Sequence, residues 1–154
     1  MSVVTYVITC FAAGILVARG CEDGFVKHRE NCYHFSHDTE TWINALTACR
    51  VIYNSQLVEI VDPGENAFLV NESTLRHMEY WIGADDLRVE GEWMWATSGD
   101  QVSNRTSGNR MFISNSANNE NCLEINAGSW NDDRCDKSQH YICQKSVQDP
   151  TVVG

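Results

Sequence analysis

Three groups of oxygen-bearing side chains have the types and spacing best suited to chemistry. In chain order they are Asp85, Asp86 and Glu90; Asn118, Asn119, Glu120 and Asn121; and Asn131, Asp132 and Asp133. Carboxylates that alternate with amides suit a hard cation such as Ca²⁺, which binds carboxylate, amide and backbone oxygens. Asn and Asp also favour turns for conformational reasons, so solvated loop residues are the alternative interpretation. The three groups therefore predict either a cation site or a set of polar loops.

The cysteines could give the second and third groups a common frame. Cys122 and Cys135 flank them, and a disulfide between these two residues would hold their strands together. The chain has seven Cys, and an even number remains once Cys10, in an apolar N-terminal stretch, is set aside. No CxxC motif occurs, which disfavours a zinc thiolate site and favours a disulfide framework formed in an oxidising compartment. Spacing alone leaves the connectivity open.

Composition and absent motifs exclude other classes of protein. The 154 residues include 21 acidic and 11 basic side chains, for a net charge of −10, whereas a nucleic-acid binder needs a basic surface. No HExxH, GxSxG or glycine-rich phosphate loop occurs. Acid–base catalysis by Glu120 and Asp132 is the weakest hypothesis, and we expect that the protein is not an enzyme.

The elements that position these groups are expected in one domain, residues 21–146. Residues 1–20 are predicted to be a secretory signal peptide, because the apolar stretch Val3–Ala18 is followed by small residues at the expected cleavage site. An uncleaved membrane anchor is the alternative. Residues 147–154 form a short polar tail. After cleavage the protein would be extracellular and would have no membrane span.

Two sequons agree with a secretory route. They begin at Asn71 and Asn104 and are predicted N-glycosylation sites. Asn104 is the stronger prediction, because it lies in a polar loop rich in Ser and Asn.

The first half of the domain predicts two helices. The buried stripe of the first consists of Trp42, Ala45, Leu46, Cys49 and Tyr53. Asp38 or Thr39 is expected to cap this helix. The second is expected to begin at Asp62 and Pro63 and to run to about His77. Its buried side is predicted to hold Phe68, Leu75 and Met78.

The second half predicts short strands, so the fold class is α+β. The aromatic and β-branched runs are Tyr80-Trp81-Ile82, Trp93-Met94-Trp95, Cys122-Leu123-Glu124-Ile125 and Tyr141-Ile142-Cys143. A polar loop from Ala96 to Asn121 separates two of these runs. A loop of this length in a small domain is usually functional.

Several of these motifs, in this order, resemble the C-type lectin-like domain family over Cys21 to Lys145. They are Trp81-Ile82-Gly83, Gly91-Glu92-Trp93-Met94-Trp95, Glu120-Asn121-Cys122-Leu123, Trp130-Asn131-Asp132 and Tyr141-Ile142-Cys143. The resemblance implies two helices, two small antiparallel sheets, a long loop region and the three disulfides of the long form. The implied pairs are Cys21–Cys32, Cys49–Cys143 and Cys122–Cys135.

The resemblance also implies a calcium site that binds sugar hydroxyls. Glu120, Asn131 and Asp132 match three ligand positions, with the backbone carbonyl of Asp132 as an additional ligand. The same side chains would contact the sugar. Asp86 and Glu90 match an auxiliary calcium site.

The sequence departs from the family at one ligand motif. Family members carry a Glu/Gln–Pro–Asn/Asp triplet in the long loop, but the only prolines here are Pro63 and Pro150. One alignment places Ser116-Ala117-Asn118 at the triplet and keeps Asn118 as a calcium and sugar ligand. An ungapped alignment places residues 112–114 there and keeps almost none. We therefore expect a weaker primary calcium site, and the sugar cannot be read from the triplet.

The leading hypothesis is a secreted, calcium-dependent lectin that binds glycans, for example on microbial surfaces, in innate recognition or agglutination. A homo-oligomer would raise its avidity. The alternative is a lectin-like domain that has lost sugar binding and recognises a protein, ice or mineral surface through the long loop.

Overall fold

The computed structural model describes residues 20–103 and 119–147, which contain two helices and eight strands. In chain order these elements are β1 (Val26–His28), β2 (Asn31–Phe35), α1 (Trp42–Val51), β3 (Gln56–Leu57), α2 (Pro63–Arg76), β4 (Tyr80–Asp85), β5 (Met94–Trp95), β6 (Cys122–Asn126), β7 (Ser129–Asp133) and β8 (His140–Ser146). The predicted α+β class is confirmed. Within these residues no helix is both long and apolar enough to cross a membrane.

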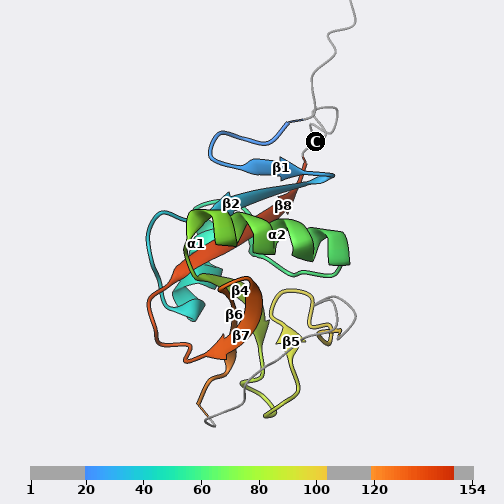
Figure 1. Ribbon diagram of the computed structural model, residues 1–154. Helices are drawn as coiled ribbons and strands as arrows, with labels where there is room; N and C mark the ends of the chain where they lie inside the picture. The colour runs from blue at the N-terminus through green and yellow to red at the C-terminus, as the bar shows by residue number, and fades with distance from the viewer. Residues whose placement is uncertain (1–19, 104–118, 148–154) are drawn as a thin grey trace, which may run out of the picture.

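The strands form two antiparallel groups that one parallel pair joins (Figure 1). In the first group β1 pairs with β2, and β2 and β3 both pair with β8. In the second group β4 pairs with β5 and β6, and β6 pairs with β7. β4 and β8 run parallel, with Tyr80 beside His140 and Trp81 beside Tyr141. The two expected antiparallel sheets are thus joined by hydrogen bonds into one continuous sheet.

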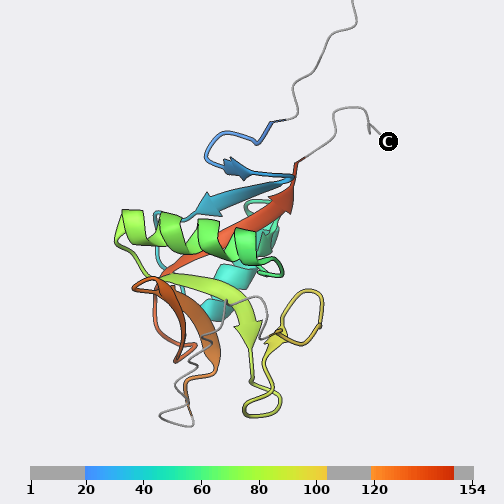
Figure 2. The same ribbon diagram turned by 45° about the vertical axis from the view of Figure 1, so that its right-hand side comes forward.

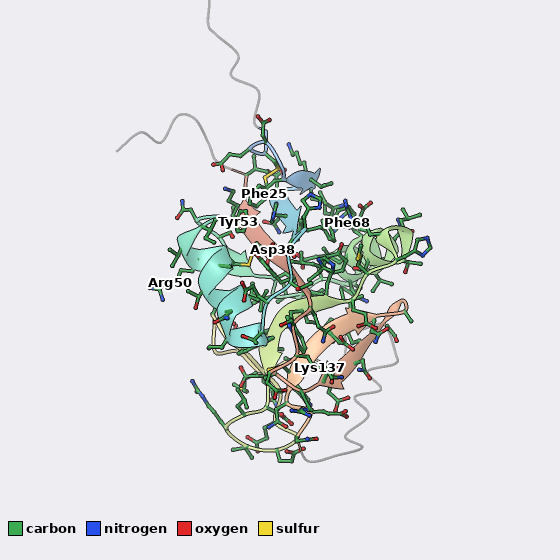
Figure 3. All side chains as sticks on the ribbon, turned by 90° about the vertical axis from the view of Figure 1, so that its left-hand side faces the viewer. Phe25, Asp38, Arg50, Tyr53, Phe68 and Lys137 are labelled. Carbon is green, nitrogen blue, oxygen red and sulfur yellow. A yellow bond between two sulfur atoms is a disulfide. The ribbon has the colours of Figure 1, made fainter. Side chains whose placement is uncertain are left out.

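β4 is buried on both faces, which explains its unbroken apolar sequence. Tyr80 and Ile82 belong to the core cluster that contains Leu69 of α2. Trp81, between them, belongs to the cluster that contains Ala45 of α1. Successive side chains of a strand point to opposite faces, so one strand serves two cores. Figures 2 and 3 show the two helices on opposite sides of the strands.

Helix α1 takes Thr41 as its N-cap, so the predicted caps Asp38 and Thr39 are wrong. The chain is still extended at Glu40, where a β-bridge holds it, and the helix cannot begin earlier. The Asp38 carboxylate instead accepts a hydrogen bond from the Tyr141 hydroxyl at 3.2 Å. The buried side of the helix consists of Trp42, Ala45, Ala48 and Cys49, with Leu46 and Tyr53 partly buried against the same cluster.

Helix α2 begins where the sequence predicts. A carboxylate oxygen of Asp62 accepts the backbone N–H groups of Gly64 at 2.9 Å and Glu65 at 3.0 Å, and Pro63 follows the cap. These bonds satisfy donors that a helix N-terminus leaves unpaired. The helix stops before His77, whose left-handed backbone forms the C-cap.

The predicted buried side of α2 is only partly correct. Leu75 is 66% exposed and Met78 is 45% exposed. Leu69 and Ser73 face the core instead, four residues apart as one helical face requires. Leu75 lies two positions beyond Ser73 and therefore points away, and Met78 lies past the end of the helix. Phe68 does pack against the core as a partly buried residue.

All three implied disulfides are present. They join Cys21 to Cys32, Cys49 to Cys143, and Cys122 to Cys135. The second bond ties α1 to β8 across a sequence separation of 94, the longest of the three. On the loop-entropy model it stabilises the fold by about 4–5 kcal/mol, and each short bond by nearer 3 kcal/mol.

Removal of the long-range disulfide should destabilise the domain most. We expect Cys49→Ala/Cys143→Ala to lower the free energy of unfolding by about 4–5 kcal/mol, because it frees the longest loop in the unfolded chain. The matched control is Cys21→Ala/Cys32→Ala, with an expected loss of about 3 kcal/mol. Urea unfolding followed by tryptophan fluorescence measures both. A loss no larger than that of the control would contradict the loop-entropy account.

Candidate functional site

The register of the β6–β7 hairpin places the predicted ligands. Cys122 pairs with Asp133, Leu123 with Asp132, and Glu124 with Asn131. The disulfide from Cys122 to Cys135 closes the same end of the hairpin. The connection after β4 reaches this end through a backbone hydrogen bond of 3.2 Å from the Asp86 N–H to the Asn121 carbonyl. Members of all three oxygen-rich groups in the sequence therefore meet there.

Buried oxygen atoms without donors mark this end of the sheet. Within the described residues, both carboxylate oxygens of Asp132 lack a hydrogen-bond partner, as do one carboxylate oxygen each of Asp86 and Glu124 and the amide oxygen of Asn121. Asp132 is 1% exposed and Asp86 is 2% exposed. A buried carboxylate without partners is costly, and a bound cation would satisfy it. The donor set, carboxylates with an amide oxygen, fits Ca²⁺.

The electrostatics of the site point the same way. Burial, with the negative charges of Glu120 and Asp86 nearby, raises the pKa of Asp132 to about 6. Burial also raises the pKa of Asp86, with a further contribution from the charge of Glu90. Like charges and burial both disfavour ionised carboxylates, and a divalent cation would reverse both effects. Asp86, Glu90, Glu120 and Asp132 therefore influence one another as one acidic site.

Asn131 is oriented by its neighbours. Its amide nitrogen donates to a carboxylate oxygen of Glu124 at 2.8 Å and to the backbone carbonyl of Asp132 at 2.8 Å. The amide oxygen of Asn131 is thus left for another partner. The Asp132 carbonyl, an implied calcium ligand, already accepts this amide hydrogen bond in the structure.

Trp130 is a core residue that positions the ligands. It is 3% exposed, and its indole N–H donates to the amide oxygen of Asn66 on α2 at 2.8 Å. Its ring makes an edge contact with Trp95. This side chain fixes β7 against α2, so the Asn131-Asp132 pair that follows has a rigid base.

Not every predicted residue falls in this arrangement. Asn118 and Asn104 lie outside the described residues, as do both alignments of the missing triplet. Asn71 lies exposed on α2. Asp133 is not a free ligand, because it pairs with Lys137 at 2.5 Å. Across residues 20–103 and 119–147, no three Asp, Glu, His or Cys side chains converge as a ready metal site. A cation here would therefore also need amide and backbone oxygens.

Sequence reasoning missed two buried glutamates, of which one holds a proposed ligand and the other holds the start of the long loop. Glu124 is 1% exposed on β6 and holds Asn131, and burial raises its pKa. Glu59 is 7% exposed and accepts the backbone N–H groups of Thr97 at 2.7 Å and Ser98 at 2.9 Å, where the long loop begins. The sequence does carry a signal for both residues, because each is a single acidic residue within a short apolar run. Glu59 lies in Leu57–Ile60 and Glu124 lies in Cys122–Ile125.

This fold recurs in proteins of a known family. Residues 38–145 match the lectin C-type domain family. Perlucin of Haliotis laevigata is 35% identical over 132 residues, covering 82% of this chain and 83% of perlucin. C-type lectin domain family 4 member M of Pan troglodytes is also 35% identical, over 84% of this chain but only 29% of its own length. This chain spans about a third of the length of several such relatives.

A solved structure supports the same assignment. The cow C-type carbohydrate-recognition domain of CD23, determined in the presence of a GlcNAc2Man3 oligosaccharide, has a TM-score of 0.73 and 27% sequence identity. The match covers 86% of this chain and 100% of that domain. The lectin-like fold implied by the sequence motifs is therefore confirmed.

Neutralising Asp132 should stabilise the metal-free domain. Because its pKa is about 6 in the folded protein and about 4 when unfolded, folding favours the protonated form. Ionisation of Asp132 therefore lowers the free energy of unfolding. This loss is absent below about pH 4 and complete above about pH 6. We expect Asp132→Asn to raise the unfolding temperature in EDTA at neutral pH, and to raise it less at low pH. Differential scanning calorimetry across this range measures the effect.

The control for Asp132→Asn makes the same chemical change on the surface. Asp136 is exposed and pairs with Arg134 at 2.6 Å, which holds its pKa below the usual value. Asp136→Asn should leave the unfolding temperature unchanged or slightly lower. A lower unfolding temperature for Asp132→Asn in EDTA at neutral pH would show that this carboxylate is stabilised by partners.

Proposed function

This chain belongs to the lectin C-type domain family, and on that premise we propose that it binds carbohydrate in a calcium-dependent manner. The observation that carries the proposal is the set of donor-free buried oxygens on Asp86, Asn121, Glu124 and Asp132. A bound cation would offset the cost of keeping both carboxylate oxygens of Asp132 buried without a donor among the described residues. The related cow carbohydrate-recognition domain, whose structure was determined in the presence of an oligosaccharide, supports the choice of ligand class.

Each proposed ligand residue contributes a particular oxygen-bearing group to the calcium site. Glu120 and Asp132 supply carboxylate charge, and Asn131 supplies the amide oxygen that its own hydrogen bonds leave available. Asn118 completes the set from the long loop. Bound Ca²⁺ would coordinate two neighbouring sugar hydroxyls. The same hydroxyls would donate hydrogen bonds to the carboxylates. Asp86 and Glu90 would hold an auxiliary ion.

The biological setting forms part of the same proposal. The signal peptide at residues 1–20 and the sequons at Asn71 and Asn104 favour a secreted glycoprotein. Its partners would be glycans of microbial or other cell surfaces, in innate recognition or agglutination, with no catalytic step. A homo-oligomer would compensate for weak single sites through avidity.

Calcium binding should depend on Asp132. Calorimetric titration of Ca²⁺ into the wild type should give heat and a saturable isotherm, and Asp132→Ala should abolish it because both donor-free oxygens are removed. Asp136→Ala, a nearby exposed carboxylate that is paired with Arg134, should titrate like the wild type. Equal heats for the wild type and Asp132→Ala would rule out this calcium site.

One sequence observation favours a second candidate function. No proline occurs between Ala96 and Asn121, so the loop lacks the family's Pro-containing ligand motif. A lectin-like domain that recognises a protein, ice or mineral surface would tolerate that loss.

A glycan array, probed in Ca²⁺ and again in EDTA, separates the two functions. The calcium-dependent lectin predicts sugar signals that disappear in EDTA, because removing the ion leaves the hydroxyls without their coordinating centre. Asp132→Ala in Ca²⁺ should reproduce the EDTA pattern, and Asp136→Ala should not. Signals absent under both conditions would favour the second function.

A further inference from the structure

A polar groove lies on a part of the molecule that contributes nothing to the calcium site. It has a volume of about 860 Å³. It is lined by the outer side of α1, the loop before β3, the end of β8 and the chain after β5. The lining residues are Asn31, Leu46, Thr47, Arg50, Asn54, Ser55, Gln56, Leu57, Ala96, Thr97, Gln144, Lys145 and Ser146. None of the proposed calcium ligands is among them.

The side chains that line this groove include two cations and no anion. The lining contains Arg50 and Lys145 and no Asp or Glu, in a chain with 21 acidic and 11 basic residues. Three carboxylates from outside the lining contact lining residues. Glu22 pairs with Lys145 at 2.7 Å, Glu59 accepts from the Thr97 N–H, and Glu65 accepts from the Gln144 amide at 2.7 Å.

The two cations differ in availability. Lys145 is already engaged by the Glu22 carboxylate at 2.7 Å, the Tyr53 carbonyl and the ring of Phe25. Arg50 makes no ion pair or hydrogen bond with any side chain in the described parts of the chain. It is exposed on α1, at the outer edge of the molecule in Figure 3. Its guanidinium is therefore available for an incoming anion.

The rest of the lining suits a sugar ring. Asn54, Gln56 and Ser146 carry amide or hydroxyl groups that have no partner among the described residues. Such groups can donate to and accept from sugar hydroxyls. Leu46, which is partly buried, adds apolar surface for the C–H face of a ring. A planar guanidinium binds sulfate or carboxylate through two parallel hydrogen bonds.

We propose that this groove is a second, calcium-independent binding site for an acidic saccharide, with Arg50 as the residue that binds its sulfate or carboxylate group. The site is independent of the calcium-dependent function proposed above. It would let one domain contact two parts of a glycan, or two different glycans, through opposite chemistries.

The test measures binding in EDTA, where the calcium site is inactive. A heparin-derived tetrasaccharide, its desulfated form and an oligogalacturonate are titrated by microscale thermophoresis. We expect binding of at least one of these anionic probes, weaker at high salt. The desulfated form keeps its uronate carboxylates, so its affinity relative to the sulfated form shows which of the two groups Arg50 binds. Arg50→Gln should weaken affinity about fivefold or more, because it removes a charged hydrogen-bond donor. Arg50→Lys should fall between, because it keeps the charge and loses the planar fork.

The matched control is Arg29→Gln, which removes one exposed positive charge that does not line the groove and is paired with Asp62. It should bind like the wild type, and unchanged unfolding temperatures should show that Arg50→Gln folds. Equal binding by the wild type and Arg50→Gln would overturn the proposal, as would binding that requires Ca²⁺ or no binding of any anionic probe. Neutral glycan binding in Ca²⁺ is measured separately, so failure of either site is distinguishable.

Discussion

The parallel pairing of β4 with β8 is the constraint on which the rest of the molecule depends. Only Tyr80 and Trp81 of β4 pair with His140 and Tyr141, yet this contact joins two antiparallel groups into one path. Parallel strands cannot be joined by a tight turn, so the intervening chain must form other structure. Both faces of β4 are then covered, one by each helix, and the Cys49–Cys143 disulfide fixes the α1 side.

The candidate calcium site is a place where this well-packed frame leaves electrostatic strain. The hairpin register places Asp132 opposite the buried Leu123, and the Cys122–Cys135 disulfide joins the two strands at this end of the hairpin. Burial of an unpaired carboxylate opposes folding, and a fold tolerates it only where the rest is stable. Three disulfides and two aromatic-rich cores provide that stability here. Rigid placement of ligands and a cost in stability are consequences of the same geometry.

Much of this could be predicted from the sequence, for identifiable reasons. The Asp62-Pro63 helix start is local chemistry, and the disulfide pairs followed from motif order in the resembled family. The side of α2 that faces the core could not be read from its apolar residues, because Ser73 is buried and Leu75 is exposed. Glu59 and Glu124 were missed because their partners, Ser98 and Asn131, depend on tertiary contacts. The candidate ligands Glu120, Asn131 and Asp132 could be proposed from the sequence because motifs in the chain mark them.

The first and last described segments lie at the same end of the molecule. Cys21 is bonded to Cys32, and the Val147 N–H donates to the Glu30 carbonyl at 2.8 Å. Asp85 pairs with Cys122 at the other end of β4, beside the candidate calcium site. Figure 1 shows this separation along the long axis of the domain. A tether, fusion partner or biosensor surface attached beyond either segment would therefore leave the candidate calcium site facing outward.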